Sequence, residues 1–217
     1  SNIIFLLSGG APFRIPRLDN CRAILHGYLG GQAGAEAMAD VLLGNETPSG
    51  KLNETWPELL EENPSYSYFP SRERTSEYRE GLYVGYRYYD TVERPVKYPF
   101  GFGLSYTSFA YSDLSLTKDA VTFTLTNTGN RDGAEVAQVY VTDCEASVLR
   151  PKKELKHYAK LSIPKGKSVH VELELTDEAF GYYDVAGKRF VVEPGDFTIG
   201  VGGSSDNLPL KATVTLR

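Results

Sequence analysis

Hydrophobic and polar residues alternate with a period of two along the second half of the chain, from residue 109 onward. Strict alternation is typical of strands that have one buried face. The pattern therefore predicts six or seven strands that form an antiparallel β-sandwich of about a hundred residues. The alternating apolar sets are Val121, Phe123 and Leu125; Ala137, Val139 and Val141; Ala159, Leu161 and Ile163; Val169, Val171, Leu173 and Leu175; Phe197, Ile199 and Val201; and Ala212, Val214 and Leu216.

The beginning of the chain follows a different pattern. Residues 3–7 form a continuous apolar run that ends at Ser8-Gly9-Gly10, and residues 21–28 contain a second short run. Continuous runs of this kind are typical of strands that are buried on both faces of a parallel sheet. A further short strand is predicted over residues 51–56, after the turn at residues 48–50.

A helix is predicted over residues 32–43. Residues 30–31 are glycines that turn the chain into it, and Gly44 stands where a left-handed C-terminal cap belongs. Two strands and one helix are only the end of an α/β sandwich, so we expect the missing strands to come from preceding sequence or from another chain. One face of the helix is apolar and consists of Ala35, Met38, Ala39 and Leu42.

Residues 57–99 connect these two patterns. The stretch is polar, interrupted by prolines and rich in Tyr, Arg and Glu. An irregular stretch of this length is uncommon inside a compact domain and usually has a function or packs closely against another part. We therefore predict three parts: the C-terminal portion of an α/β sandwich domain over residues 1–56, a connector over residues 57–108, and the β-sandwich over residues 109–217.

Several strings in the chain carry a resemblance to a known family. They are GGQAGAEAMADVLLG at residues 30–44, followed by PSGKL; YREGLYVGYRYYD at residues 78–90; and YPFGFGLSYTSF at residues 98–109. In this order they resemble the end of the second domain, the linker and the start of the third domain of glycoside hydrolase family 3, the β-glucosidases and their relatives. NTG at residues 127–129 and VEPGDF at residues 192–197 resemble the fibronectin type III-like domain that closes many members.

The resemblance implies an α+β fold, in which a truncated α/β segment with a parallel sheet precedes an antiparallel immunoglobulin- or fibronectin III-like β-sandwich. It also implies a parent enzyme that hydrolyses terminal β-linked glycosides with retention and without a cofactor. Retaining glycosidases need two carboxyl groups about 5–5.5 Å apart. In the family, the nucleophilic Asp comes from an N-terminal (β/α)8 barrel, and the acid/base Glu usually lies in the α/β domain ahead of residues 3–7. Neither position exists in this sequence, so no catalytic residue is assigned, and we expect the chain alone to be structural and inactive.

Other readings of the chain remain open at this point. It could be a free-standing carbohydrate- or protein-binding module, which an exposed row of Tyr or Trp on one face of the sandwich would favour. It could also be a subunit that completes an active site on another chain. The truncated segment predicts self-association through residues 1–45, because an apolar strand with unpaired backbone groups is a template for pairing.

Composition and charge exclude several classes of protein. The net charge is −5 and no basic stripe is present, so nucleic-acid binding is not expected. No apolar run approaches the ~20 residues of a membrane span. Cys21 and Cys144 stand far apart in the sequence, and we expect two buried or idle thiols rather than a disulfide.

Two glycine-containing loops are candidates for ligand binding. Residues 44–52 are similar to a phosphate-binding loop, but the spacing is one residue too long, Leu52 stands where Ser or Thr is required, and the loop follows a helix. We therefore interpret it as a structural turn. Residues 30–34 do precede a helix and could line a ligand crevice at the carboxyl ends of the strands, or they could let the helix pack close to the sheet.

The histidines do not predict a metal site. His26, His157 and His170 lie on separate segments, with no Cys or carboxylate at metal-ligand spacing, and the alternation places His170 on an outward face. Two Asn-X-Thr patterns, at residues 45–47 and 53–55, are interpreted as chance occurrences of the glycosylation acceptor.

Three carboxylates of the connector lie among tyrosines. Glu77, Glu80 and Asp90 could grip a sugar together with the neighbouring rings. Arg79 and Arg87 are equally close in the sequence, so we favour a network of ion pairs and packed rings between domains.

Overall fold

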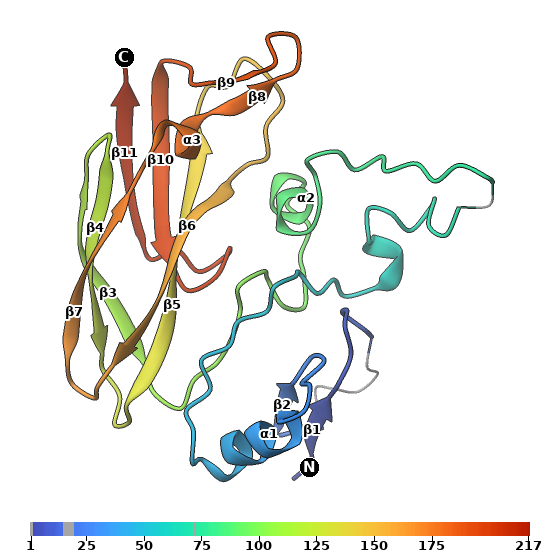
Figure 1. Ribbon diagram of the computed structural model, residues 1–217, viewed down its shortest axis with the longest axis vertical. Helices are drawn as coiled ribbons and strands as arrows, with labels where there is room; N and C mark the ends of the chain where they lie inside the picture. The colour runs from blue at the N-terminus through green and yellow to red at the C-terminus, as the bar shows by residue number, and fades with distance from the viewer. Residues whose placement is uncertain (1, 15–19, 72) are drawn as a thin grey trace.

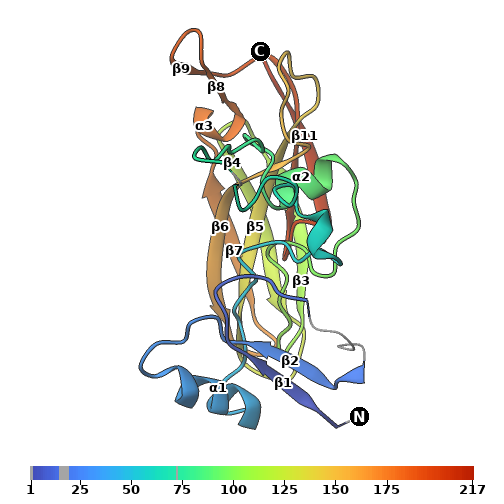
Figure 2. The same cartoon turned by 90° about the vertical axis from the view of Figure 1, so that its right-hand side faces the viewer.

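The structure is a computed structural model and describes residues 2–14, 20–71 and 73–217. Figure 1 shows a tall β-sandwich formed by the second half of the chain and a small α/β segment near the N-terminus. The view in Figure 2 places the α/β segment at one end of the sandwich. The connector lies beside both regions and presents helix α2 (Tyr86–Thr91) to the sandwich.

The sandwich consists of two antiparallel sheets. One has the strand order β11-β10-β5-β6 and the other has the order β3-β4-β7. The β-sandwich that the alternation predicts is therefore confirmed. Its strands are β3 (Phe109–Leu116), β4 (Ala120–Asn127), β5 (Gly133–Asp143), β6 (Glu154–Ile163), β7 (Ser168–Glu174), β10 (Gly195–Gly202) and β11 (Leu210–Leu216).

The apolar positions of the alternation form the core between the two sheets. Phe123 of β4 lies opposite Val171 of β7, and Val121 lies opposite Leu173. Short elements close one end of this core: α3 (Asp177–Phe180), β8 (Tyr182–Asp184) and β9 (Arg189–Val191). They are too short to produce a period in the sequence. The core residues include Val121, Phe123, Leu125, Ala137, Val139, Val141, Ile163, Val171, Phe180, Phe197, Ile199 and Val201.

Strand β5 is buried on both of its faces, which the alternation did not predict. Gln138 and Tyr140 stand at the polar positions of the pattern, yet they are 3% and 1% exposed. The connector covers them. Gln138 donates to the carbonyl of Gly101 at 3.3 Å, and the ring of Tyr86 lies edge-on to that of Tyr140, with 5.7 Å between the ring centroids.

The α/β segment contains two parallel strands, β1 (Ile4–Leu7) and β2 (Ala23–His26), paired from Ile4 with Ala23 to Leu7 with His26. The prediction that both faces are buried is wrong in this structure. Leu7 is buried, but Ile4 and Leu6 are 48% and 50% exposed. The described residues supply β1 with one neighbouring strand and too little apolar surface to cover it.

Helix α1 (Gly34–Leu43) starts two residues later than predicted and is followed by Gly44, whose φ of 77° confirms the left-handed cap. None of its residues is buried, and of the predicted apolar face only Met38 is half-buried. Met38 lies over Gly27, where an added Cβ would come within 2.6 Å of the Met38 sulfur. Gly27 therefore allows the helix to approach the end of β2.

The connector is more ordered than the sequence predicts, since it contains α2 and a 3-10 turn (Leu60–Glu62). The strand predicted over residues 51–56 is wrong, because the chain bends at Asn53 and Glu54. What remains is a single bridge between Trp56 and Tyr98.

Polar contacts fasten the α/β segment to the sandwich. Lys51 forms an ion pair of 2.9 Å with Glu135 of β5, and both side chains are largely buried. Arg131 of the sandwich donates to the carbonyl of Gly44 at 2.9 Å. The connector adds a contact, because the hydroxyl of its Tyr106 donates to the carbonyl of Val41 at 2.7 Å. Among the described residues, no helix is long and apolar enough to cross a membrane.

Candidate functional site at the carboxyl ends of the parallel strands

Aromatic rings gather where β1 and β2 end. The ring of His26, the last residue of β2, lies 4.0 Å from that of Tyr28 and 5.3 Å from that of Trp56 between centroids. Phe13, on the loop that follows β1, lies 5.5 Å from Trp56 and 5.9 Å from His26. In open α/β sheets, ligands bind outside the carboxyl ends of the strands, so this cluster is the candidate site.

Burial shifts the polar groups of the cluster toward their neutral forms. It lowers the pKa of His26, against the opposing influence of the Leu7 carbonyl, and it raises the pKa of the Glu54 carboxyl. The pKa of Tyr28 is also raised by burial, while its hydroxyl accepts a hydrogen bond from the backbone N–H of Asn53 at 3.3 Å. A neutral imidazole, a phenol and a weakened acid can exchange hydrogen bonds with an uncharged polar ligand.

Five buried polar atoms in or beside this cluster have no hydrogen-bond partner among the described residues. They are His26 Nδ1 and Nε2, Glu54 Oε1, Thr55 Oγ1 and Trp56 Nε1. Buried polar groups in native proteins are nearly always paired, so such a group needs an explanation. The sequence did not single out Glu54, which appeared only inside an Asn-X-Thr pattern. Glu54 lies near Tyr28 and Trp56, and no sequence-spacing pattern links these three positions.

Among the described residues, one carboxyl group lies at the cluster, that of Glu54. Retaining glycoside hydrolysis requires two carboxyl groups about 5–5.5 Å apart, one as nucleophile and one as acid/base. The described residues of the cluster can therefore contribute apolar contact and hydrogen bonds to a site, and they do not include this catalytic pair.

The two glycine loops have different surroundings. Residues 30–34 lie next to the candidate site, where Gly31 has a φ of 65° and Gly34 donates to its carbonyl at 3.3 Å. Whether they line a crevice stays a prediction. Residues 44–52 instead run along the sandwich: the hydroxyl of Thr47 donates to the carbonyl of Asp132 at 2.9 Å, and Lys51 is paired with Glu135. These contacts agree with a structural turn.

The structure does not bring the three connector carboxylates together. Glu77 pairs with Arg79 on an exposed stretch, whereas Asp90 lies on α2 and pairs with Lys153 at 3.0 Å. Burial raises the pKa of Asp90, and Lys153 opposes this shift. Glu80 lies near Tyr68 instead. Burial raises the pKa of Tyr68, and the charge of Glu80 raises it further. A shared sugar grip is not formed.

Helix α2 is joined to the first residues of β6 by polar contacts. The hydroxyl of Tyr86 accepts from the backbone N–H of Leu155 at 2.7 Å, and Arg87 lies 3.6 Å from Glu154. The hydroxyl of Thr91 accepts from the backbone N–H of Lys152 at 2.9 Å. Together with the pair of Asp90, these contacts form the network of rings and ion pairs that the connector sequence favoured.

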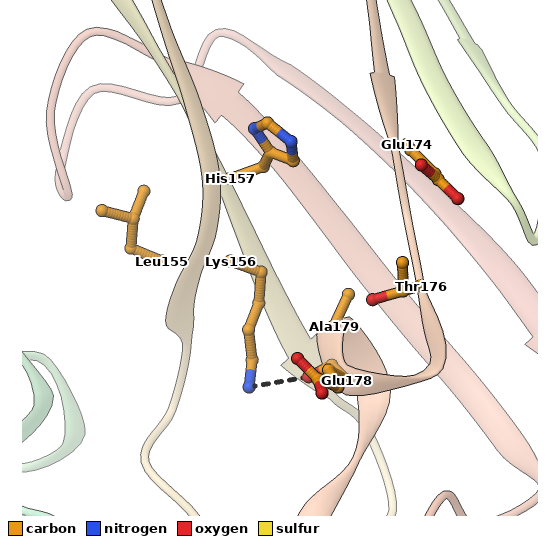
Figure 3. A pocket seen from close by; sticks show the side chains of 7 residues that line it. All are labelled: Leu155, Lys156, His157, Glu174, Thr176, Glu178 and Ala179. Carbon is orange, nitrogen blue, oxygen red and sulfur yellow. Dashed lines mark hydrogen bonds between the residues drawn. The ribbon is translucent and has the colours of Figure 1, made fainter.

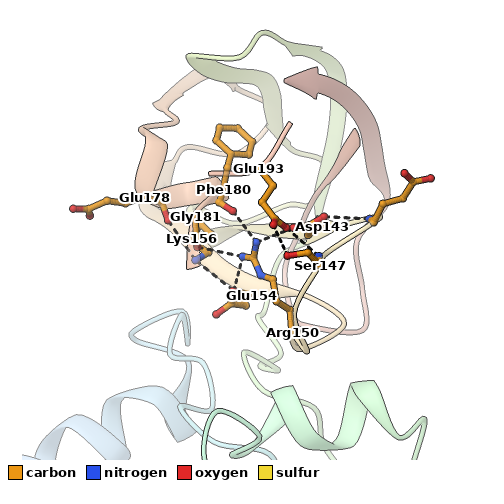
Figure 4. Close-up of polar contacts among 10 residues, drawn as sticks. Asp143, Ser147, Arg150, Glu154, Lys156, Glu178, Phe180, Gly181 and Glu193 are labelled. Atoms are coloured by element: carbon orange, nitrogen blue, oxygen red, sulfur yellow. Dashed lines mark hydrogen bonds and ion pairs between the residues drawn. The ribbon is translucent and has the colours of Figure 1, made fainter. Parts of the chain in front are cut away.

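A buried arginine organises the end of the sandwich near α2. Figure 4 shows Arg150 between two carboxylates, and the ion-pair distances to Asp143 and Glu154 are both 3.0 Å. Arg150 also donates to the carbonyls of Phe180 at 2.8 Å and Gly181 at 3.3 Å. The side chain is 7% exposed, so its charge depends on these partners.

A pocket on the sandwich borders this network (Figure 3). Lys156 donates to the carbonyl of Glu178 at 3.4 Å and lies 3.5 Å from Glu154. Burial lowers the pKa of Lys156, against the opposing influence of Glu154. Because its ammonium is already paired, the pocket is explained by packing at the end of the core. Its lining is Leu155, Lys156, His157, Glu174, Thr176, Glu178 and Ala179.

The histidines lie apart, as the sequence predicts. His26 is in the aromatic cluster, His157 lines the pocket, and His170 is exposed on β7. Within residues 2–14, 20–71 and 73–217, no group of three or more His, Cys, Asp or Glu side chains is placed to hold a metal ion. Cys21 and Cys144 are not joined in a disulfide, and Cys144 is exposed rather than buried.

Comparison with known proteins identifies the family. Residues 1–106 match the family model of the glycosyl hydrolase family 3 C-terminal domain, and residues 135–205 match that of the fibronectin type III-like domain. The chain belongs to glycoside hydrolase family 3. The α/β segment and connector of this family 3 chain thus correspond to the first match, and most of the sandwich corresponds to the second.

Relatives match this family 3 chain along its whole length. It is 45% identical to thermostable β-glucosidase B of Acetivibrio thermocellus, over 100% of this chain and 30% of that protein. It is 39% identical to an exo-α-(1→6)-L-arabinopyranosidase of Bifidobacterium breve, over 100% of this chain and 29% of that protein. A crystal structure of a Bifidobacterium adolescentis family 3 β-glucosidase superposes with a TM-score of 0.93 at 42% identity, over 98% of this chain and 32% of that one. The chain thus spans about a third of the length of these relatives.

Proposed function

We propose that the chain is the non-catalytic C-terminal portion of a retaining β-glycosidase that hydrolyses terminal β-linked sugars without a cofactor. The observation that carries the proposal is the match of 100% of this chain to only 30% of the length of a β-glucosidase. Among the described residues the aromatic cluster has one carboxyl group, which supports the proposal because the reaction needs two. β-Glucosides are the first substrates to test, and the arabinopyranosidases among the relatives make aryl α-L-arabinopyranosides the second.

The role of the segment in the parent enzyme is structural. The ion pair of Lys51 with Glu135 and the hydrogen bond from Arg131 to the carbonyl of Gly44 hold the α/β segment against the sandwich. The sandwich therefore braces the end of the α/β domain at which the cluster of His26, Glu54 and Trp56 lies. The cluster would line the site, while the reacting carboxylates come from sequence outside this chain.

The experiment is hydrolysis of aryl β-glucosides by the purified 217-residue chain. We expect no activity above that of a blank. Hydrolysis that survives Glu54→Gln, Glu77→Gln and Glu80→Gln, each made separately, would overturn the assignment of catalysis to sequence outside the chain. Loss of such hydrolysis on one of these substitutions would instead place catalysis in the aromatic cluster or the connector.

A second candidate function is to complete an active site on another chain, and the half-exposed side chains of β1 favour it. Ile3, Ile4 and Leu6 are each about half exposed, and burying one such side chain is worth roughly 1.5–3 kcal/mol. The same surface supports self-association of the isolated chain through residues 1–45. Light scattering at micromolar concentration tests this: a strictly monomeric chain whose first strand is protected from hydrogen exchange would contradict it.

A carbohydrate-binding module is less well supported. Among the described residues after 109, the exposed aromatic side chains include Tyr158 on β6 and the pair Tyr183 and Phe190 on the β8–β9 hairpin. They lie on different elements, and the rings of Tyr183 and Phe190 meet edge-on at an angle of 73°. This arrangement differs from the row along one sheet face that would favour sugar binding.

A further inference from the structure

The first part of the connector exposes an unusual amount of apolar surface. We name residues 57–85 the connector arm. None of its described residues is buried, and the exposed fractions of its large apolar side chains run from 40% for Leu59 to 89% for Tyr78. Exposed apolar surface of this extent marks an interaction site. The side chains are Leu59, Leu60, Tyr66, Phe69, Tyr78, Leu82 and Val84.

The arm is anchored at both of its ends. Trp56, just before the arm, is 5% exposed and exchanges backbone hydrogen bonds with residues 97–98. Tyr86, just after it, is also 5% exposed and is held by β6. The arm is therefore a long loop with two fixed ends, which projects away from the sandwich beyond α2 in Figure 1.

Local contacts give the arm a shape, although it has no core of its own. The guanidinium of Arg79 lies over the ring of Tyr68, 5.6 Å from its centroid. The backbone N–H of Phe69 donates to the carbonyl of Ser65 at 2.9 Å, and the hydroxyl of Ser71 donates to that of Thr75 at 2.6 Å. The contact of Arg79 with Tyr68 joins the later part of the arm to the earlier part, and the two hydrogen bonds form local turns. The apolar side chains of the arm remain exposed.

The arm starts at the candidate site. Trp56 contacts both Phe13 and His26 at the carboxyl ends of β1 and β2, and the arm leaves directly from it. The arm thus begins beside the edge of the α/β segment at which Glu54 Oε1 and Trp56 Nε1 have no described partner. One body packed against this side would reach both surfaces.

We propose that the connector arm docks on the preceding, catalytic region of the parent enzyme and positions it against the candidate site. This inference rests on the proposed function. The length of the relatives supports this occupant, because about 70% of the A. thermocellus protein lies outside the part that this chain matches. The family's C-terminal domain match runs over residues 1–106, so it includes the whole arm, and its apolar face belongs to that domain rather than to a flexible spacer.

The test uses the intact parent enzyme with a double substitution in the arm, Phe69→Ser with Tyr78→Ser. The matched control is Tyr183→Ser with Phe190→Ser, which removes the same two residue types from the exposed β8–β9 hairpin. The readout is the rate of trypsin cleavage after Arg74 and Arg79, both exposed in the isolated chain. We expect the arm variant to be cleaved at least about tenfold faster than the parent enzyme, because two buried aromatic contacts are lost, and the control variant to be unchanged.

The second part of the experiment uses the isolated 217-residue chain. There the same double substitution should leave the cleavage rate unchanged, because Phe69 and Tyr78 are already exposed. Equal cleavage of parent enzyme and arm variant would overturn the proposal. The proposal would also be overturned if the arm were protected only in a dimer of the parent enzyme and the arm variant were monomeric. In that case a second copy of the protein would cover the arm. Cleavage is measured without substrate, so it does not depend on glycosidase activity. If the parent enzyme lacks glycosidase activity but its arm is protected, the proposed function is refuted and the docking of the arm is not.

Discussion

The β-sandwich and the α/β segment of this chain differ in how far each buries its own apolar residues. Phe123, Phe197 and Ile199 of the sandwich are fully buried by other strands of the same domain. In the α/β segment Leu7 is buried, while Ile4 and Leu6 are about half exposed and no residue of α1 is buried. The sandwich encloses a core, whereas the segment presents one face of a core.

The contacts between the two regions explain how the segment keeps its place. Lys51 and Glu135 form a largely buried ion pair across the boundary, and α2 covers Tyr140 and the start of β6. These contacts are mostly polar and local, so they orient the segment but do not bury its strands. The comparison teaches that the sandwich buries its apolar residues within this chain, whereas the α/β segment is oriented by polar contacts at its boundary.

The largest expected effect comes from separating the two regions. Residues 109–217 alone should unfold in a single cooperative transition, because the core residues belong to this part. Residues 1–56 alone should show no cooperative transition. Thermal unfolding followed by circular dichroism measures both. If residues 109–217 lack a transition that the full chain has, the boundary is wrong and the connector belongs to the folding unit.

Matched truncations within each region give the next largest effect. Phe123→Ala should lower the free energy of unfolding by about 3–5 kcal/mol, because it leaves a cavity in a closed core. Met38→Ala, in the half-buried face of α1, should cost less than about 1 kcal/mol, because little area is returned to water. Urea unfolding of the full chain measures both values. Equal losses would mean that the α/β segment encloses a core that contributes to the same transition.

The sequence predicts the sandwich well because its strands bury one another's apolar side chains. Val121, Phe123 and Leu125 alternate in the sequence and are all buried in the structure. The same reasoning failed at residues 3–7. An apolar run shows that a strand needs apolar neighbours on both faces, but it does not show that the described part of this chain provides them. It failed at Gln138 and Tyr140 for the opposite reason, because the connector covers a face that the alternation marks as polar.

The candidate site was harder to predict than the fold. Phe13, His26 and Trp56 come from three separate loops and strand ends, and their contacts depend on the parallel pairing of β1 with β2. Single-sequence patterns carry no signal for such contacts. The docking of α2 was partly predictable, because Arg87 and Asp90 have the charges that ion pairs require. Their partners, Glu154 at the start of β6 and Lys153 just before it, are more than sixty positions away.

The ion pair at the boundary should give an intermediate effect. Lys51→Met leaves the Glu135 carboxylate, whose side chain is 8% exposed, with the hydroxyl of Tyr111 as its remaining donor at 3.2 Å. We expect a loss of about 1–3 kcal/mol in the free energy of unfolding and faster hydrogen exchange in α1. Lys118→Met is the matched control, because the pair of Lys118 with Asp119 is exposed, and it should change neither quantity. Unchanged exchange in α1 on Lys51→Met would show that the segment is held by other contacts.

The smallest expected effect is a dependence on pH at the junction of α2 and β6. Burial works to raise the pKa of Glu154, but Lys156, Arg150 and Arg87 outweigh it and lower the pKa below its ordinary value of 4.5. A carboxyl whose pKa is lower in the folded state stabilises that state above the unfolded pKa, and the contribution is lost as the pH falls through the folded pKa. Glu154→Gln keeps an oxygen that can accept from Arg150 and leaves Asp143 paired with that arginine. The substitution should therefore cost about 1 kcal/mol near pH 7, and the difference from the unmodified chain should vanish in acid.

Urea unfolding of both proteins from pH 7 down through the titration of Glu154 measures this difference. The pKa of Asp90 is raised by burial, so its contribution to stability increases as the pH falls and opposes that of Glu154 in either protein alone. Asp90 is present in both proteins, and subtracting one stability curve from the other removes its contribution. A difference that stays constant across this range would show that Glu154 acts through its shape and hydrogen bonds rather than its charge. The junction would then be held by Tyr86 and its ring contacts, and the support that the sandwich gives to the connector would not depend on pH.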